Sequence, residues 1–203
     1  MGQRRFLAEA VRGQAVGVEM SRYSIAARCL VGVAILVSTA AAQTPPYGNR
    51  LSPYVASPPK VVDRMLELAT IKPGETLYDL GCGDGRVLIA AVEKYNAKAI
   101  GVEISPKVAA RARTWIKKAG VQDQASVIQG DLLQVDLTGA DVVVIYLARQ
   151  LNEELRPRLE KFLKPGARVV SHDYPVAGWK PTKVDRSSAH VIYLYEMPPV
   201  KPE

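Results

Sequence analysis

A glycine-rich turn flanked by carboxylates is the part of this 203-residue sequence whose residue types could do chemistry. Residues 79–85 read Asp-Leu-Gly-Cys-Gly-Asp-Gly, directly after a short apolar run and directly before a helical pattern. Gly81 and Gly83 have no Cβ, so the backbone can turn tightly there and lie against a ligand. In a doubly wound sheet this turn lies at the carboxyl end of the first strand, where such folds bind ligands. The amides that open the following helix favour a polar or anionic group.

A second carboxylate indicates a ligand that contains ribose. Glu103 follows Gly81 by 22 residues, at the end of the next apolar strand, where a carboxylate can accept both ribose hydroxyls. Dinucleotide-binding proteins share this arrangement, but their pattern G-x-G-x-x-G would require glycine at position 86, and the chain has Arg86. The third glycine is Gly85 instead.

The segment 79–85 resembles motif I of the class I S-adenosylmethionine-dependent methyltransferases, and Glu103 resembles their ribose-binding acid. The resemblance implies S-adenosylmethionine as the cofactor. Asp79 would bridge to it through the loop amides or its amino group, whereas Asp84 would contact the methionine moiety or cap the next helix. An acid just after the third strand lies near the adenine in this family, and Asp131 stands at that place. The cofactor-binding residues that the resemblance implies are Tyr54, Asp79, Gly81, Gly83, Asp84, Glu103, Ile104, Asp131 and Leu132.

A narrower resemblance indicates the methyl acceptor. The segments 53–58, 78–86, 168–172 and 178–181 resemble the small lysine N-methyltransferases that act on the ATP synthase c-subunit and the adenine nucleotide translocase, and their prokaryotic relatives. The likeness covers about residues 50–195. It implies a protein substrate whose lysine amine is methylated. Family members also carry an N-terminal hydrophobic segment, which implies association with a membrane.

Two side chains are candidates for acting on the acceptor. Tyr146 ends the fourth apolar run, where the acceptor should lie, but it could equally be a core aromatic. His172 follows the fifth strand and could take a proton or be an ordinary hydrogen-bonded histidine. A lysine must lose a proton before it attacks, since its pKa is about 10.4 in water. The Asp/Asn-Pro-Pro-aromatic tetrapeptide of amide and adenine N-methyltransferases is missing, because residues 146–149 read Tyr-Leu-Ala-Arg.

Two other functions are consistent with the same cofactor-binding motifs. A small-molecule methyltransferase would require a lidded pocket, and this chain has no long insertion to form a lid. A binding module that has lost catalysis would keep the fold without transferring methyl groups. Neither alternative is excluded by the motifs, and the oligomeric state is not predicted.

The remaining reactive side chains and the net charge indicate neither a metal nor nucleic acid. Cys82 is expected as a small residue within the turn, and His190 as a surface or strand-packing residue. No cysteine and histidine cluster has metal-ligand spacing, so no metal is expected. Residues 1–42 hold five Arg and two Glu, which is +3 of the net charge of +7 and leaves +4 elsewhere. The other basic residues alternate with acids, so nucleic-acid binding is not expected.

Periodicity predicts the elements that position these residues. Strands are expected at 76–80, 99–103, 126–129, 141–146, 167–171, 182–186 and 190–196, and helices at 61–69, 86–95, 106–119 and 152–163. The alternation predicts an α/β fold with a doubly wound, mostly parallel seven-stranded sheet, Rossmann-like as in class I methyltransferases. The last two strands have no helix between them, so they predict an antiparallel C-terminal hairpin.

The N-terminal part reads as a leader. Arg22 and Arg28 precede an apolar run at 29–37, and Ala40-Ala41-Ala42 forms an A-x-A cleavage site. We expect residues 1–42 to be a signal peptide or a membrane anchor, with Met20 as an alternative start. The protein would then be exported to the periplasm or membrane-anchored, and cytoplasmic if the leader does not function. Residues 43–59 are expected to be a Pro-rich extended segment, 60–197 the methyltransferase domain and 198–203 a tail.

Overall fold

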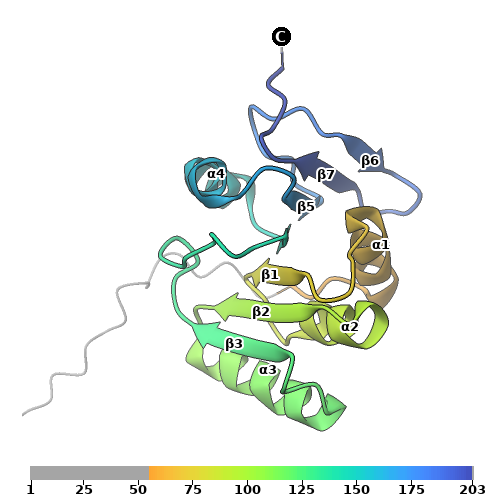
Figure 1. Cartoon of the computed structure of the whole chain (residues 1–203), viewed down its shortest axis with the longest axis vertical. Coiled ribbons are helices and arrows are strands. Elements are labelled where there is room, and N and C mark those ends of the chain that lie inside the picture. Colours follow the sequence, from red (N-terminus) through yellow and green to blue (C-terminus); the bar gives the residue numbers. More distant parts are fainter. Residues whose placement is uncertain (1–54, 203) are drawn as a thin grey trace, which may run out of the picture. The chain divides into compact units, whose positions relative to one another are not determined.

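The computed structural model describes residues 55–202, which form a seven-stranded sheet covered by helices on both faces (Figure 1). The strands are β1 (Thr76–Leu80), β2 (Lys98–Glu103), β3 (Ala125–Gln129), β4 (Val142–Ile145), β5 (Arg168–His172), β6 (Lys183–Asp185) and β7 (Ile192–Glu196). The helices are α1 (Pro59–Ala69), α2 (Arg86–Tyr95), α3 (Pro106–Ala119) and α4 (Arg149–Phe162). Across the sheet the order is β3-β2-β1-β4-β5-β7-β6. All neighbours are parallel except that β7 is antiparallel to both β5 and β6.

This topology confirms the predicted doubly wound sheet with an antiparallel C-terminal hairpin. The predicted leader and Tyr54 lie outside the described residues. Within 55–202, no helix combines the length and the hydropathy that a bilayer crossing requires. Val200, which follows the hairpin, pairs with Lys180, which precedes it, in an isolated bridge. The expected tail therefore contacts the domain as far as Val200.

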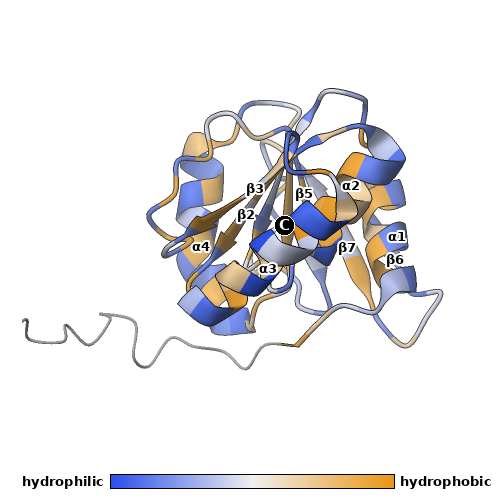
Figure 2. Ribbon diagram, turned by 90° about the horizontal axis from the view of Figure 1, so that it is seen from below, coloured by the Kyte–Doolittle hydropathy of each residue, from blue (hydrophilic) through white to orange (hydrophobic). Residues whose placement is uncertain are grey.

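The sheet has two hydrophobic faces because alternate side chains of each buried strand point in opposite directions. In β4 every residue is buried: Val142 and Val144 pack with α1 and α2, while Val143 and Ile145 pack on the side of α4. Figure 2 shows these apolar strands between α4 on one side and α1 and α2 on the other. A parallel strand covered on both faces reads as a continuous apolar run, which is the pattern seen in the sequence.

The element boundaries lie within three residues of the expected ones, and two of the differences have a physical reason. The helix expected from residue 152 begins at Arg149, because Asn152 is buried within it and its Nδ2 donates to the Tyr174 carbonyl (3.2 Å). Asparagine commonly caps helices, but here its side chain makes a tertiary contact instead. The strand expected from 190 begins at Ile192, so His190 lies in the turn before β7.

The tightest packing under the glycine turn is at Gly101 of β2. A Cβ built there would lie 2.5 Å from Cys82 Sγ and 2.7 Å from Leu88 Cδ1. We expect Gly101→Ala to lower the free energy of unfolding by about 1 to 3 kcal/mol, because the loop must shift to accept the methyl group. Urea titration measures this change. Gly139→Ala is the control, since a Cβ at that glycine would meet nothing within 4 Å; equal stability of the two variants would contradict the packing argument.

Candidate active site

The glycine turn between β1 and α2 folds back onto the end of β2. Gly81 and Gly83 both have positive φ, 87° and 56°, which glycine adopts without a steric cost. The amides of Gly81 and Cys82 both donate to the Val102 carbonyl, at 2.8 and 3.0 Å. The buried Cys82 thiol, whose pKa is raised above its usual range by desolvation and then by Asp79 and Glu103, fills the small space beneath the turn. Its expected role as a small residue matches this position.

Glu103 connects this turn to the end of β2. One carboxylate oxygen accepts from the Gly83 amide (3.0 Å), and the other accepts from the Ser105 amide (2.9 Å). The side chain is buried, yet each carboxylate oxygen can accept a second hydrogen bond. The two ribose hydroxyls of a bound nucleoside could use that remaining capacity. The Gly130 amide donates to the Glu103 carbonyl (3.0 Å), which brings the loop of Asp131 to the same end of the sheet.

Asp79 is a buried carboxylate without a hydrogen-bond donor among residues 55–202. Desolvation, followed by the nearby carboxylates of Glu103 and Asp84, raises its pKa to about 8. A buried acid of this kind is stabilised in its ionised form by a positive ligand or a donor. S-adenosylmethionine carries an ammonium and a sulfonium group. The buried carboxylates of Asp79, Glu103 and Asp84 therefore fit this positively charged cofactor.

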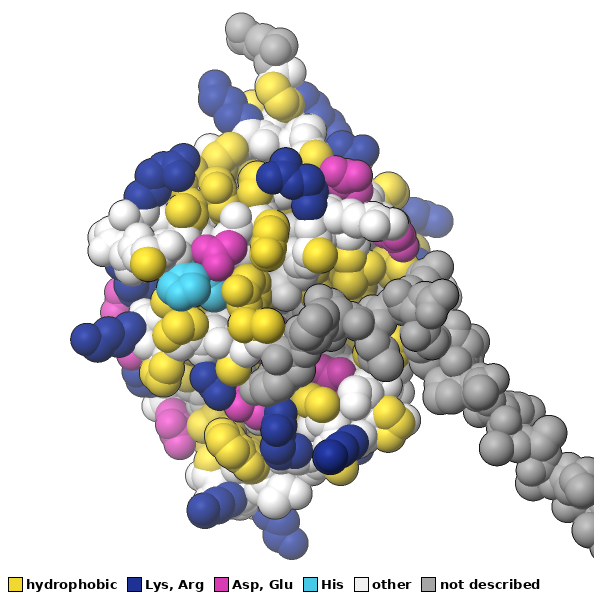
Figure 3. Space-filling model, turned by 180° about the vertical axis from the view of Figure 1, so that it is seen from behind, with side chains coloured by type: hydrophobic (Ala, Val, Ile, Leu, Met, Phe, Trp, Pro, Cys, Tyr) yellow, Lys and Arg dark blue, Asp and Glu magenta, His cyan; other side chains and the backbone are white. Residues whose placement is uncertain are grey.

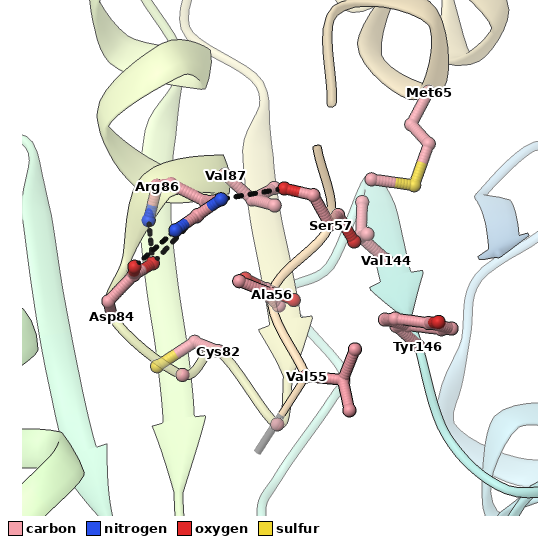
Figure 4. A pocket seen from close by; sticks show the side chains of 13 residues that line it. Val55, Ala56, Ser57, Met65, Cys82, Asp84, Arg86, Val87, Val144 and Tyr146 are labelled. Carbon is pink, nitrogen blue, oxygen red and sulfur yellow. Dashed lines mark hydrogen bonds and ion pairs between the residues drawn. The ribbon is translucent and has the colours of Figure 1, made fainter. Parts of the chain in front are cut away.

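Asp84 is held by Arg86 at the start of α2. Arg86 donates to it from Nε (3.0 Å) and from Nη2 (2.6 Å), and its backbone amide donates to Oδ1 at 3.3 Å. The third guanidinium nitrogen donates to the Ser57 carbonyl (2.8 Å), as Figure 4 shows. Arg86, at the position where a dinucleotide site would need glycine, therefore ties the turn to the segment 55–57 before α1. The N-cap of α2 is Gly85, which makes no side-chain cap, so Asp84 does not cap this helix and its contact with the methionine moiety stays a prediction.

These elements line an open cavity whose empty space, part of it continuous with solvent, is about 380 Å³. It is lined by the segment before α1, the glycine turn and the ends of β1 and β4, which contribute Val55, Ala56, Ser57, Met65, Asp79, Gly81, Cys82, Gly83, Asp84, Arg86, Val87, Val144 and Tyr146. Four predicted cofactor residues, those at 79, 81, 83 and 84, thus meet in one place, with Glu103 directly beside Gly83.

Four predicted cofactor residues do not line the cavity: Glu103, which accepts from the Gly83 amide, and Ile104, Asp131 and Leu132. Ile104 is half-buried after β2, and Leu132 packs against the core cluster on the α4 side. Asp131 is half-buried and accepts from the Leu133 amide (2.9 Å), which closes a local turn. Their contact with an adenosine group stays a prediction.

Tyr146 and His172 belong to a polar cluster with Ser57, Asp173 and His190, three residues that the sequence did not predict as part of the site. His172 is fully buried; its Nδ1 lies 2.9 Å from Ser57 Oγ and its Nε2 lies 3.0 Å from His190 Nδ1. The same His190 nitrogen lies 3.0 Å from Asp173 Oδ2. The Tyr146 hydroxyl donates to that oxygen at 3.4 Å, and the Tyr146 ring packs on the His172 ring with centroids 3.9 Å apart.

Burial determines the charge states in this cluster. Desolvation lowers the pKa of His172 to about 4 against the opposing effect of Asp173, so the imidazole is neutral at neutral pH. Desolvation also acts to raise the pKa of Asp173, but hydrogen bonds from His190 and the Val191 amide outweigh it and the net shift is downward. The pKa of Tyr146 is raised by desolvation and by Asp173, so it remains a phenol. Because both ring nitrogens of His172 are already bonded, the structure favours the hydrogen-bonded histidine over the proton acceptor.

The expectation that His190 is a surface or packing residue missed this cluster. His172, Asp173 and His190 place three ligand-type atoms within 4.8 Å of one another, although no metal was expected from sequence spacing. A tight turn at Asp173 and the return of the chain before β7 create this arrangement. In the described part of the chain these three groups hydrogen-bond to one another.

Comparisons with known proteins agree with this geometry. The family model of the ANTKMT methyltransferase domain matches residues 79–183. The protein-lysine N-methyltransferase of Saccharolobus islandicus is 47% identical over 148 residues, which cover 70% of this chain and 92% of that protein. The adenine nucleotide translocase lysine N-methyltransferase of Mus musculus is 32% identical, over 71% of this chain and 63% of that protein. The ATP synthase c-subunit lysine N-methyltransferase of Mus musculus is also 32% identical, over 83% of this chain and 68% of that protein.

A crystal structure gives the corresponding result for the fold. It is described as an RNA methyltransferase from Salinibacter ruber in complex with S-adenosyl-L-homocysteine, and it aligns with a TM-score of 0.71 and 42% identity over 73% of this chain and 97% of that one. Fold and cavity thus define a class I S-adenosylmethionine-dependent methyltransferase. The chain belongs to the ANTKMT methyltransferase family.

We expect Glu103→Gln to weaken the binding of S-adenosylmethionine and of S-adenosylhomocysteine by about tenfold or more, because the amide removes the charge and one acceptor. Both ligands carry the same ribose, so both should weaken alike. Calorimetry measures the two dissociation constants. Glu93→Gln, at an exposed position of α2, is the matched control; unchanged affinity in Glu103→Gln would reject the ribose assignment.

The raised pKa of Asp79 predicts a pH-dependent stability of the protein without cofactor. The pKa of Asp79 is about 8 in the folded protein, above its ordinary value of 3.8. The folded state therefore has its full stability with respect to this group below pH 3.8, where Asp79 is protonated, and loses it as the pH rises through 8. We expect the free energy of unfolding of the wild type, relative to Asp79→Asn, to fall between pH 5 and 8. Urea titrations across this range measure the difference. A difference independent of pH would show that Asp79 is already ionised.

Proposed function

We propose that the protein transfers methyl groups from S-adenosylmethionine to a lysine amine of a protein substrate. The observation that carries the proposal is the uncharged part of the cavity lining beside Tyr146. There the side chains of Ser57, Met65, Val144 and Tyr146 lie together, whereas the charged lining residues Asp79, Asp84 and Arg86 belong to β1, the glycine turn and the start of α2 (Figure 4). An apolar surrounding favours the neutral form of an amine over its ammonium form. Only the neutral form attacks a methyl group.

When bound, S-adenosylmethionine supplies a methyl group on a sulfonium: the amine nitrogen forms the N–C bond while the C–S bond breaks and its electron pair stays on sulfur. The leaving group needs no proton, so the protein's contribution is alignment and exclusion of water. Tyr146 ends β4 directly beside β1, since Leu80 pairs with Ile145. Its backbone therefore lies next to the strand end that carries the cofactor turn, while its hydroxyl reaches Asp173 after β5.

Exposed apolar side chains border this end of the cavity and suit the aliphatic stem of a lysine. Val55 lines the cavity with 62% of its surface exposed. Tyr174 is 40% exposed, and its ring stacks on Tyr146 with centroids 6.3 Å apart. Figure 3 shows histidine reaching one face of the molecule among hydrophobic side chains. Such a surface can pack against the methylene groups of a substrate lysine.

The three relatives named above support a protein acceptor, whereas the crystal structure at 42% identity is described as an RNA methyltransferase. A relative named as a protein-lysine N-methyltransferase is 47% identical, and it is spanned to 92% of its length. The mouse enzymes named for the adenine nucleotide translocase and the ATP synthase c-subunit are 32% identical, but they are spanned only to 63% and 68%. The target itself is therefore not inferred from those names. The leader expected at 1–42 would bring the protein to a membrane, so the target is sought in membrane fractions first.

Labelled methyl transfer tests the proposal. The purified protein is incubated with S-adenosylmethionine carrying a radioactive methyl group and with membrane, soluble-protein and RNA fractions of the source cell. We expect the label to appear as methyl-lysine after acid hydrolysis of protein, and Glu103→Gln to reduce it in proportion to its weaker cofactor binding. Label confined to nucleosides or to small metabolites would contradict a protein acceptor.

A further inference from the structure

The cluster behind Tyr146 contains one carboxylate that the proposed mechanism has not yet used. Asp173 follows β5 with φ of 60°, a left-handed backbone that non-glycine residues seldom adopt. Three hydrogen bonds hold this turn: the Asp173 amide donates to the Val191 carbonyl (2.7 Å), the Val191 amide donates to Asp173 Oδ1 (3.0 Å), and the Tyr174 amide donates to the His172 carbonyl (2.7 Å). Strained backbone that is fixed so thoroughly is a frequent feature of functional sites.

Hydrogen counting shows what Asp173 does to its neighbours. An ionised carboxylate has no hydrogen to donate, so the groups that face Oδ2 must present theirs. His190 Nδ1, at 3.0 Å, therefore carries its hydrogen toward Asp173, and the Tyr146 hydroxyl points its hydrogen the same way at 3.4 Å. Hydrogen bonds of this length in an enzyme without substrate often tighten when the substrate binds.

The same constraint reaches the buried histidine. His172 Nε2 lies 3.0 Å from His190 Nδ1 and 3.4 Å from Asp173 Oδ2, so the carboxylate also faces this ring nitrogen. The other ring nitrogen, Nδ1, lies 2.9 Å from Ser57 Oγ. Because burial keeps it neutral, His172 adds no positive charge beside an incoming ammonium.

We propose that Asp173 is a positioning residue that keeps Tyr146 as a hydrogen-bond acceptor for the amine to be methylated. This inference rests on the proposed lysine acceptor. With its own hydrogen engaged by Asp173, the Tyr146 oxygen presents only lone pairs to the cavity that it lines. The oxygen accepts an N–H of the substrate amine and leaves the nitrogen lone pair free to face the methyl group. The charge of Asp173 behind it also attracts the lysine while the lysine is still an ammonium.

Asp173→Asn separates this role from a structural one. Asparagine tolerates the left-handed backbone, and its carbonyl can still accept from the Val191 amide. Its NH2 group, however, donates to His190 and Tyr146 where the carboxylate accepted. The Tyr146 hydrogen is then turned toward the cavity, against the substrate N–H.

The first readout is the ring nitrogen chemical shifts of His172 in protein labelled with 15N-histidine, measured without cofactor or substrate. Because Asp173→Asn puts an NH2 group where the carboxylate faced His172 Nε2, we expect the His172 ring nitrogen shifts of this variant to differ from those of the wild type. Asp123→Asn, at an exposed position, is the control and should match the wild type. Unchanged His172 shifts in Asp173→Asn would overturn the proposal. Stoichiometric zinc in the purified protein would also overturn it, because the ring nitrogens would then bind metal.

The second readout is transfer of labelled methyl groups to the protein fraction of the source cell. We expect kcat to fall by about tenfold or more in Asp173→Asn and in Tyr146→Phe, with the dissociation constant for S-adenosylmethionine unchanged. The double variant should lose no more than either single variant, because Asp173 acts through Tyr146. Multiplied losses would show that Asp173 acts elsewhere. If the label enters another class of acceptor while the His172 shifts still change in Asp173→Asn, the lysine assignment fails and the role of Asp173 in orienting Tyr146 stands.

Discussion

The close burial of three carboxylates is the constraint on which the rest of this structure depends. Asp79, Asp84 and Glu103 lie together at the ends of β1 and β2, where their charges repel and water is scarce. Two of them have partners within the protein: Glu103 accepts two backbone amides and Asp84 is paired with Arg86. Asp79 has no donor among the described residues, so its charge is stabilised only when a cationic ligand arrives. The site therefore gives up stability in the free protein for affinity toward a positively charged cofactor.

The sheet provides the geometry that this arrangement needs. β1 lies between β2 and β4. The cofactor turn after β1 and Tyr146 after β4 therefore lie at the same end of two neighbouring parallel strands. Gly101 leaves room for the turn to fold onto β2. The antiparallel return of β7 beside β5 brings the Val191 backbone to Asp173, where two hydrogen bonds fix the turn after β5. The C-terminal hairpin therefore contributes to the acceptor side of the site.

The sequence predicted the parts of the site that local chemistry defines. The glycine turn, Glu103 at the end of its strand and Tyr146 at the end of β4 follow from motifs and periodicity within a few residues, and the structure brings them to one end of the sheet. Ser57 and His172 are 115 residues apart, and no spacing rule connects them. His190 was expected to be a surface or packing residue because the turn that aims it at Asp173 depends on tertiary hydrogen bonds. The start of α4 was misplaced for a similar reason, since Asn152 contacts Tyr174 instead of capping a helix.

A crystal structure of the protein with S-adenosylhomocysteine tests the central claim most directly, because this ligand carries the ribose, the amino group and the sulfur that the site is argued to recognise. The account predicts both ribose hydroxyls within hydrogen-bond distance of Glu103, the amino group beside Asp79 and the sulfur facing the cavity wall that Tyr146 and Ser57 form. A ligand whose ribose lies away from Glu103, or whose sulfur faces away from Tyr146, would contradict it.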